Sequence, residues 1–158
     1  MSDPGSPISF YDQVGGRPFF ERLVGVFYEG IADDPVLRPM YPEADLGPAR
    51  ERMLLFLEQY WGGPTTYSER RGHPRLRMRH ASFHVNPDAR DRWLAHMRRA
   101  VDAVELPPIL EATLWDYLQR AAYAMVNTFE PTGIGAAPDG RAGHGLIATS
   151  RDDEPPKE

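Results

Sequence analysis

The stretch RMLLFLEQYWGGPTTYSERRGHPRLRMRHASF, residues 52–83, decides the fold. Its first part repeats apolar side chains at the i, i+3, i+4, i+7, i+8 spacing of an amphipathic helix. These side chains are Met53, Phe56, Leu57, Tyr60 and Trp61. The following Gly-Gly-Pro ends the helix, because glycine and then proline are typical signals after a helix C-terminus. We therefore predict a helix over 48–61 and a polar loop over 62–75, which leads the chain to His80.

Three further segments carry the same helical period, and we predict helices over 18–32, 87–104 and 108–129. A proline stands at or just before the start of every predicted helix, where its missing N–H costs no hydrogen bond. These prolines are Pro18, Pro48, Pro87, Pro107 and Pro108. Asn86, directly before the third helix, is a good N-cap. No segment alternates apolar and polar residues as a strand does, so the predicted fold class is all-α.

The two ends of the chain differ in composition from its middle. Residues 1–7 are predicted to be a disordered lead-in, and residues 131–158, rich in glycine, proline and charge, a flexible tail. The working domain is therefore predicted over 8–130, with a single core. Within it we expect a short helix before Gly15–Gly16 and one helical turn over 34–38.

The composition argues against several classes of protein. With a net charge of −5, the chain lacks the positive charge that a general nucleic-acid binder needs. It has no cysteine, which rules out disulfides, thiolate zinc sites and covalent haem attachment. It has no apolar run of the roughly 18–20 residues that a membrane span requires, and no signal-peptide pattern. We expect a cytoplasmic protein.

Two of the five histidines, His80 and His84, are four residues apart and would share one face of a helix. This spacing is typical of zinc sites such as HExxH, so one alternative is a non-haem metal hydrolase that uses both histidines. The glutamate of that motif is missing, and Pro87 limits the helix. A second alternative is a single axial bond from His80 to a haem iron. A third is an ordinary solvated or hydrogen-bonded histidine.

Tyr28, Tyr41 and Trp93 together would give an apolar pocket a polar lining, because buried tyrosine and tryptophan usually find partners for their O–H and N–H groups. Arg52 flanks the apolar stripe of its helix and is suited to pair with a carboxylate at a pocket rim. Each of these residues also has a simpler interpretation, as a core aromatic or a solvated arginine. If that holds for all of them, the chain is a helical interaction module without a cofactor.

Four stretches of this sequence resemble the truncated haemoglobins of group II, or O-type, found in actinobacteria. They are FYDQVGG (10–16), FYEGIADDPVLRPMYPEADL (27–46), the opening stretch (52–83) and DRWLAHM (91–97). The resemblance covers about 8–129. It implies a two-over-two α-helical sandwich that holds haem b, iron protoporphyrin IX, without a covalent bond. The glycine pairs at 15–16 and 62–63 match the family's motifs that support the short first helix and the long loop.

The resemblance also implies roles for individual residues. His80 falls on the proximal position and would bind the iron through Nε2, with its other ring nitrogen donating to a backbone carbonyl or a similar group. Tyr28, Tyr41 and Trp93 fall on the distal positions that hydrogen-bond the ligand. The remaining cofactor contacts would be a propionate rim of Arg52, Tyr67 and Arg79 and an apolar set of Met53, Phe56, Met78 and Phe83. Ala49 stands where many globins carry a distal histidine, and it would leave an opening toward the haem edge.

The function implied is binding of dioxygen, carbon monoxide and nitric oxide. Strong distal hydrogen bonding favours slow ligand release, and hence redox chemistry or sensing rather than bulk oxygen transport. Oxidation of nitric oxide or peroxidase-like turnover would need a separate reductase. An oligomer is compatible with the sequence. The rival metal hydrolase predicts bound zinc or iron without a Soret band, and the interaction module predicts a colourless protein.

Overall fold

A computed structural model describes residues 8–81 and 83–130 of the chain. Within these residues there are helices and no strand, which confirms the all-α prediction. The elements, in order, are α1 (Phe10–Gln13), α2 (Arg17–Ala32), the 3-10 helix η1 (Arg38–Met40), α3 (Gly47–Tyr60), α4 (Thr66–Arg71), α5 (Leu76–Arg79), α6 (Pro87–Ala103) and α7 (Pro108–Met125). The predicted lead-in, 1–7, and tail, 131–158, lie outside the described residues.

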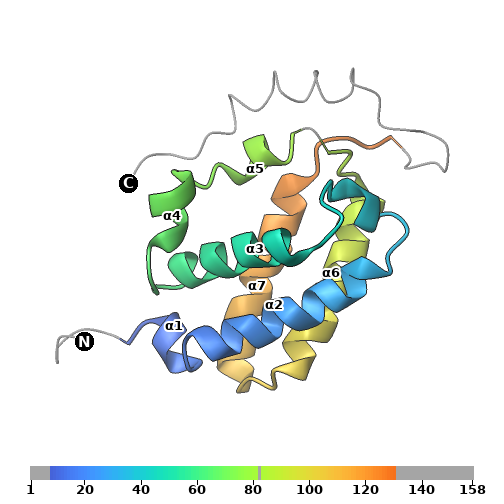
Figure 1. Cartoon of the computed structure of the whole chain (residues 1–158). Coiled ribbons are helices and arrows are strands. Elements are labelled where there is room, and N and C mark those ends of the chain that lie inside the picture. The colour runs from blue at the N-terminus through green and yellow to red at the C-terminus, as the bar shows by residue number, and fades with distance from the viewer. Residues whose placement is uncertain (1–7, 82, 131–158) are drawn as a thin grey trace.

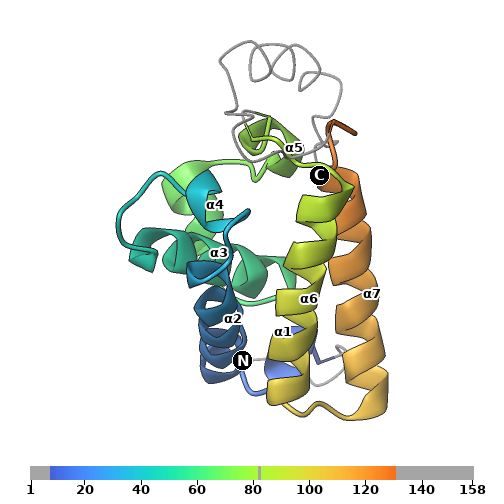
Figure 2. The same cartoon turned by 90° about the vertical axis from the view of Figure 1, so that its right-hand side faces the viewer.

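Two pairs of helices form the layers of the fold. Helix α2 packs against α3, α6 packs against α7, and α2 also packs against α6 and so joins the two pairs. Figure 2 shows α6 and α7 side by side, with α2 and α3 as the other pair. The short helices α4 and α5 follow α3, and α5 contacts α7 (Figure 1). This arrangement is the predicted two-over-two sandwich. Among the described helices we find none with the length and apolar character of a membrane span.

The core lies where α2 meets α6 and α7. The apolar stripe of α2, made of Leu23, Phe27 and Ile31, is fully buried. The partners buried against it from the other layer include Met97, Ala100, Val101 and Leu114. Each large apolar side chain removed from water in this way contributes about 1.5–3 kcal/mol, so this contact holds the two layers together.

Three of the four main helices, α2, α3 and α6, start and end within one residue of the prediction. Helix α6 also has the predicted N-cap, in which Asn86 Oδ1 accepts from the Ala89 N–H at 2.8 Å. The predicted end of the fourth helix at residue 129 is wrong. Helix α7 ends at Met125. The backbone N–H groups of Asn127 and Thr128 donate instead to the carbonyl oxygen of Val85, at 2.8 and 3.3 Å. These bonds to a distant segment replace the next helical turn.

The predicted loop over 62–75 is partly wrong as well, because it contains helix α4. Reciprocal bonds join this helix to the end of α3: the side-chain amide of Gln59 donates to Ser68 Oγ at 2.7 Å and accepts from the Ser68 N–H at 2.9 Å. The burial of Tyr67 anchors the same helix. The turn expected over 34–38 is present, closed by Arg38 N–H on the Asp34 carbonyl at 2.9 Å, and it runs on into η1.

Helix α1, the short helix expected before Gly15–Gly16, packs on the end of α3. Two glycines permit this contact. Gly62 has a φ of +100°, and a Cβ added there would lie 2.7 Å from that of Ser9. A Cβ on Gly63 would lie 2.7 Å from the ring of Tyr11. Larger residues at 62 or 63 would therefore push α1 away.

Glu58 is a buried carboxylate where α1, α2 and α3 meet. It is 1% exposed, and it accepts from Tyr11 Oη at 3.2 Å and from Arg17 Nη1 at 3.1 Å. We predict that Glu58→Ala lowers the free energy of unfolding by about 2–4 kcal/mol, because it removes two hydrogen bonds and leaves a cavity. Urea titration measures the change.

The matched control is Glu21→Ala. Glu21 pairs with the same arginine, at 3.2 Å, but its side chain is 54% exposed. An exposed i, i+4 pair contributes about 0.5 kcal/mol at most. Equal losses in the two variants would contradict the structural importance assigned to Glu58.

Candidate functional site

A cavity of about 480 Å³ lies among the helices, within the size range of roughly 300–1,000 Å³ usual for ligand and cofactor sites. Its lining is mainly apolar. The predicted site residues that line it are Tyr28, Tyr41, Arg52, Met53, Phe56, Tyr67, Arg79, His80, Phe83 and Trp93, and Ala49 lines it too. The fold therefore brings residues from α2 to α6 into one chamber.

Met78 is the predicted site residue that does not line the cavity. It is 39% exposed, and Leu76 lines the cavity in its place. Helix α5 is a single turn, and residues two apart on a helix lie on nearly opposite sides. Once His80 and Leu76 face the cavity, Met78 must face away. The predicted packing of Met78 against a cofactor is therefore corrected.

His80 caps the C-terminus of α5. Its Nδ1 lies 2.7 Å from the carbonyl oxygen of Leu76. A carbonyl only accepts, so Nδ1 carries the proton and Nε2 keeps its lone pair. Burial lowers the pKa of His80 below 6.5, and the bond to Leu76 only partly opposes this. The ring is therefore neutral near pH 7, with one nitrogen ready to bind a metal.

Tyr28, Tyr41 and Trp93 lie together in the cavity wall. The ring centroids of Tyr28 and Tyr41 are 5.7 Å apart, and Phe27 links this pair to Trp93 through edge contacts. Burial raises the pKa of both tyrosines. The hydrogen bond between their hydroxyls raises the pKa of Tyr28 further and lowers that of Tyr41. Both stay protonated at neutral pH and can donate hydrogen bonds.

The two arginines expected at the rim have different partners. Arg52 Nη1 pairs with Glu43 Oε2 at 3.1 Å, and the bond lowers the pKa of Glu43. Arg79 instead donates Nε to the Pro74 carbonyl at 2.7 Å and Nη2 to the Arg71 carbonyl at 2.8 Å. Arg79 thus holds the chain between α4 and α5 in place, while Arg52 and its carboxylate partner Glu43 both line the cavity.

The C-terminal half of α7 supplies cavity residues that the sequence did not assign to the site. They are Tyr117, Leu118, Ala121, Ala122 and Met125. Most of them belong to the apolar stripe of this helix, and a core-facing stripe cannot be distinguished by period from one that faces a cavity. Ala121 and Ala122 are the sequence signal that could have indicated a cavity beside this helix, because small side chains leave space.

His84 takes no part in the cavity. Its Nε2 lies 3.0 Å from the carbonyl oxygen of Glu130, in the segment after α7. Among residues 8–81 and 83–130, no group of three or more His, Cys, Asp or Glu side chains could hold a metal ion. The described residues thus give no support to a two-histidine hydrolase site.

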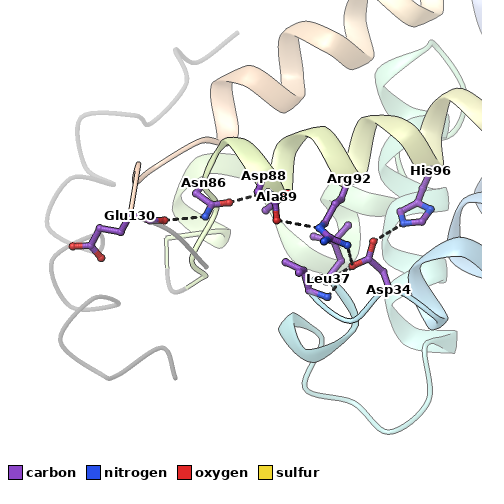
Figure 3. A network of polar contacts seen from close by, with 9 residues as sticks. Asp34, Leu37, Asn86, Asp88, Ala89, Arg92, His96 and Glu130 are labelled. Atoms are coloured by element: carbon purple, nitrogen blue, oxygen red, sulfur yellow. Dashed lines mark hydrogen bonds and ion pairs between the residues drawn. The ribbon is translucent and has the colours of Figure 1, made fainter. Parts of the chain in front are cut away.

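Asp34 joins the turn after α2 to helix α6 (Figure 3). Its Oδ1 accepts from the backbone N–H groups of Val36 and Leu37 at 2.8 and 2.9 Å, and its Oδ2 lies 2.7 Å from His96 Nε2. Arg92 Nη1 lies 3.4 Å from the same carboxylate. Because Leu37 and Trp93 of α6 both line the cavity, this network connects two parts of the cavity wall.

The pKa of Asp34 gives a pH-dependent prediction. Burial raises this pKa, but bonds from His96 and the two backbone amides outweigh burial, and the pKa falls below 3.8. A carboxyl with a lowered folded-state pKa stabilises the fold above its unfolded pKa, and the contribution is lost as the pH falls through the folded value. We expect Asp34→Asn to cost about 1–2 kcal/mol at pH 7 and progressively less below about pH 4.

Urea titrations of both proteins across this pH range measure the difference. Asp116→Asn is the control, since that carboxylate is 67% exposed and pairs only with Arg120 on its own helix among the described residues. It should change stability little at either pH. A cost for Asp34→Asn that stays constant down to pH 3 would contradict the prediction.

Comparisons with known proteins identify the family to which the chain belongs. A family model described as bacterial-like globin matches residues 9–127. A group 2 truncated haemoglobin of Bacillus subtilis is 39% identical over 115 residues, which cover 73% of this chain and 86% of that protein. The solved structure of a thermostable haemoglobin from the actinobacterium Thermobifida fusca is 66% identical, with a TM-score of 0.76, over 78% of this chain and 100% of the other.

The solved structure of a truncated oxygen-avid haemoglobin from Bacillus subtilis is 38% identical, with a TM-score of 0.71, over 76% of this chain and 100% of that one. The family match and these relatives span the cavity-forming part of the chain. The chain belongs to the bacterial-like globin family and, within it, to the group II truncated haemoglobins.

Proposed function

We propose that the chain is a haem protein that binds dioxygen and the other diatomic ligands carbon monoxide and nitric oxide. In this proposal haem b is held without a covalent bond and His80 is its proximal ligand. One observation carries the proposal: a single apolar cavity contains His80, with its Nδ1 held by the Leu76 carbonyl, together with the donors of Tyr28, Tyr41 and Trp93.

The residues of the cavity suit haem. Phe56, Phe83 and Met53 give it an apolar wall, and the guanidinium of Arg52 can serve a propionate. One imidazole is enough as the protein's ligand to haem, because the porphyrin already binds the iron through four nitrogens. A bare metal ion would require several protein ligands instead.

Bound haem supplies an iron that binds diatomic ligands and exchanges electrons. The chain's own residues would tune this site. The Leu76 carbonyl fixes the tautomer and orientation of His80. The hydroxyl of Tyr28 and the indole N–H of Trp93 would donate to the negative charge of a ligand, each bond contributing on the order of 1.5–3 kcal/mol.

Strong distal donors favour slow ligand release, so we propose a redox or sensing role and not bulk oxygen transport. The description of the Bacillus subtilis relative as oxygen-avid supports this choice. Oxidation of nitric oxide or peroxidase-like turnover, if it occurs, needs a separate reductase. The cytoplasmic location and the oligomeric state stay predictions.

Titration of haemin into the apoprotein tests the proposal. We expect a Soret band that saturates at one haemin per chain and a rise in thermal stability, because the ligand binds only the folded state. His84→Ala is the control and should titrate like the wild type, since His84 is outside the cavity. Loose binding without saturation, or unchanged stability, would refute a built haem site.

A further inference from the structure

Asn127 lies two residues beyond the end of α7, in the segment whose helical prediction was wrong. Its side-chain amide contacts the backbone around His80. Nδ2 donates to the carbonyl oxygens of His80 at 3.2 Å and Phe83 at 3.1 Å, and Oδ1 accepts from the Val85 N–H at 3.1 Å. Both amide protons and the amide oxygen are thus engaged by the segment between α5 and α6.

The surrounding contacts keep this segment and the one after α7 together. The Asn127 N–H donates to the Val85 carbonyl at 2.8 Å. Farther along, the Glu130 carbonyl accepts from Asn86 Nδ2 at 2.9 Å, as Figure 3 shows. Of these contacts, the side chain of Asn127 is the one that reaches the backbone of His80.

The segment that carries His80 needs such support. Helix α5 has four residues, and so short a helix has little stability of its own. The ring of His80 is held from within that turn, by Leu76. Its backbone carbonyl, in contrast, accepts from the Phe83 N–H at 3.0 Å and from Asn127. Asn127 therefore provides an anchor that connects this turn to the end of α7.

We propose that Asn127 is a positioning residue that fixes the backbone of the proximal histidine from the end of α7. This inference rests on the proposed ligand role of His80. Asn127 itself touches neither cofactor nor ligand; it acts through the height and tilt of the imidazole. Outer residues that orient a metal ligand typically change metal affinity 10–100-fold when they are replaced.

The test compares Asn127→Ala with the wild type, as full-length, haem-loaded ferrous proteins. Resonance Raman spectroscopy measures the iron–histidine stretching band, and transfer to excess apomyoglobin measures haem release. We expect the band to shift or broaden and haem release to become about 10-fold faster or more. A purely structural contribution would lower the melting temperature and leave the band unchanged.

His84→Ala is the matched control. It removes the contact of the same segment with Glu130 and leaves the His80 carbonyl untouched, so its band should match the wild type. Asn127→Asp keeps the acceptor for Val85 N–H but loses both donors, and should behave like the alanine variant. If Asn127→Ala does not fold, Asn127→Asp tests the positioning role in its place.

The outcomes separate this inference from the proposed function. A wild-type band and wild-type haem release in either Asn127 variant would overturn the positioning role alone. A wild-type protein without any iron–histidine band would overturn the ligand assignment of His80, on which the proposed function depends.

Discussion

His80→Gly is expected to lose stable haem binding, and free imidazole is expected to restore it. The reason is that His80 lines the cavity as a half-buried, neutral imidazole with Nε2 available. Loss of a residue that only orients a ligand costs 10–100-fold in affinity, so loss of the ligand itself should exceed that. Haem release to apomyoglobin, measured with and without imidazole, gives the result.

His84→Gly is the control for this substitution. It creates the same backbone change four residues away, outside the cavity, and should keep haem as the wild type does. If His80→Gly still shows a five-coordinate, histidine-type ferrous spectrum without added imidazole, another residue is the proximal ligand.

Tyr28→Phe is expected to speed dioxygen release by tenfold or more. Tyr28 is 5% exposed, and its hydroxyl belongs to the hydrogen-bonded tyrosine pair in the cavity wall. A hydrogen bond to a charged acceptor contributes on the order of 1.5–3 kcal/mol, and about 1.4 kcal/mol is a factor of ten. Stopped-flow displacement of dioxygen by carbon monoxide measures the release rate.

The coupling of the two tyrosines can be measured in the same way. Because their hydroxyls are bonded to each other, the effects of Tyr28→Phe and Tyr41→Phe should not add, and the double variant should reveal a coupling of about 0.5–3 kcal/mol. Tyr60→Phe is the control, at a 49% exposed tyrosine outside the cavity. Release rates that are equal in the wild type and Tyr28→Phe would remove Tyr28 from the distal site.

The helices could be predicted from the sequence because their signals are local. Prolines mark the starts of α2, α3, α6 and α7, and apolar periodicity marks their buried faces. The end of α7 could not be predicted in this way. Its helical pattern continues past Met125, but the deciding partner is Val85, 42 residues away from Asn127 along the chain.

The cavity shows the same division between local and distant information. The resemblance to a family named fewer than half of its lining residues, and it placed Met78 in the wall where the turn of α5 presents Leu76. The bond from His80 Nδ1 to a backbone carbonyl matches what that resemblance implied. The link from Asp34 to His96 had no sequence signal, since it depends on how α2 packs against α6.

The most direct test of the central claim is the absorption spectrum of the purified full-length protein, reduced without oxygen and then exposed to dioxygen or carbon monoxide. A haem globin with His80 as ligand predicts a Soret band that shifts with each gas and returns when the gas is removed. A colourless protein, or stoichiometric zinc without a Soret band, would contradict the claim.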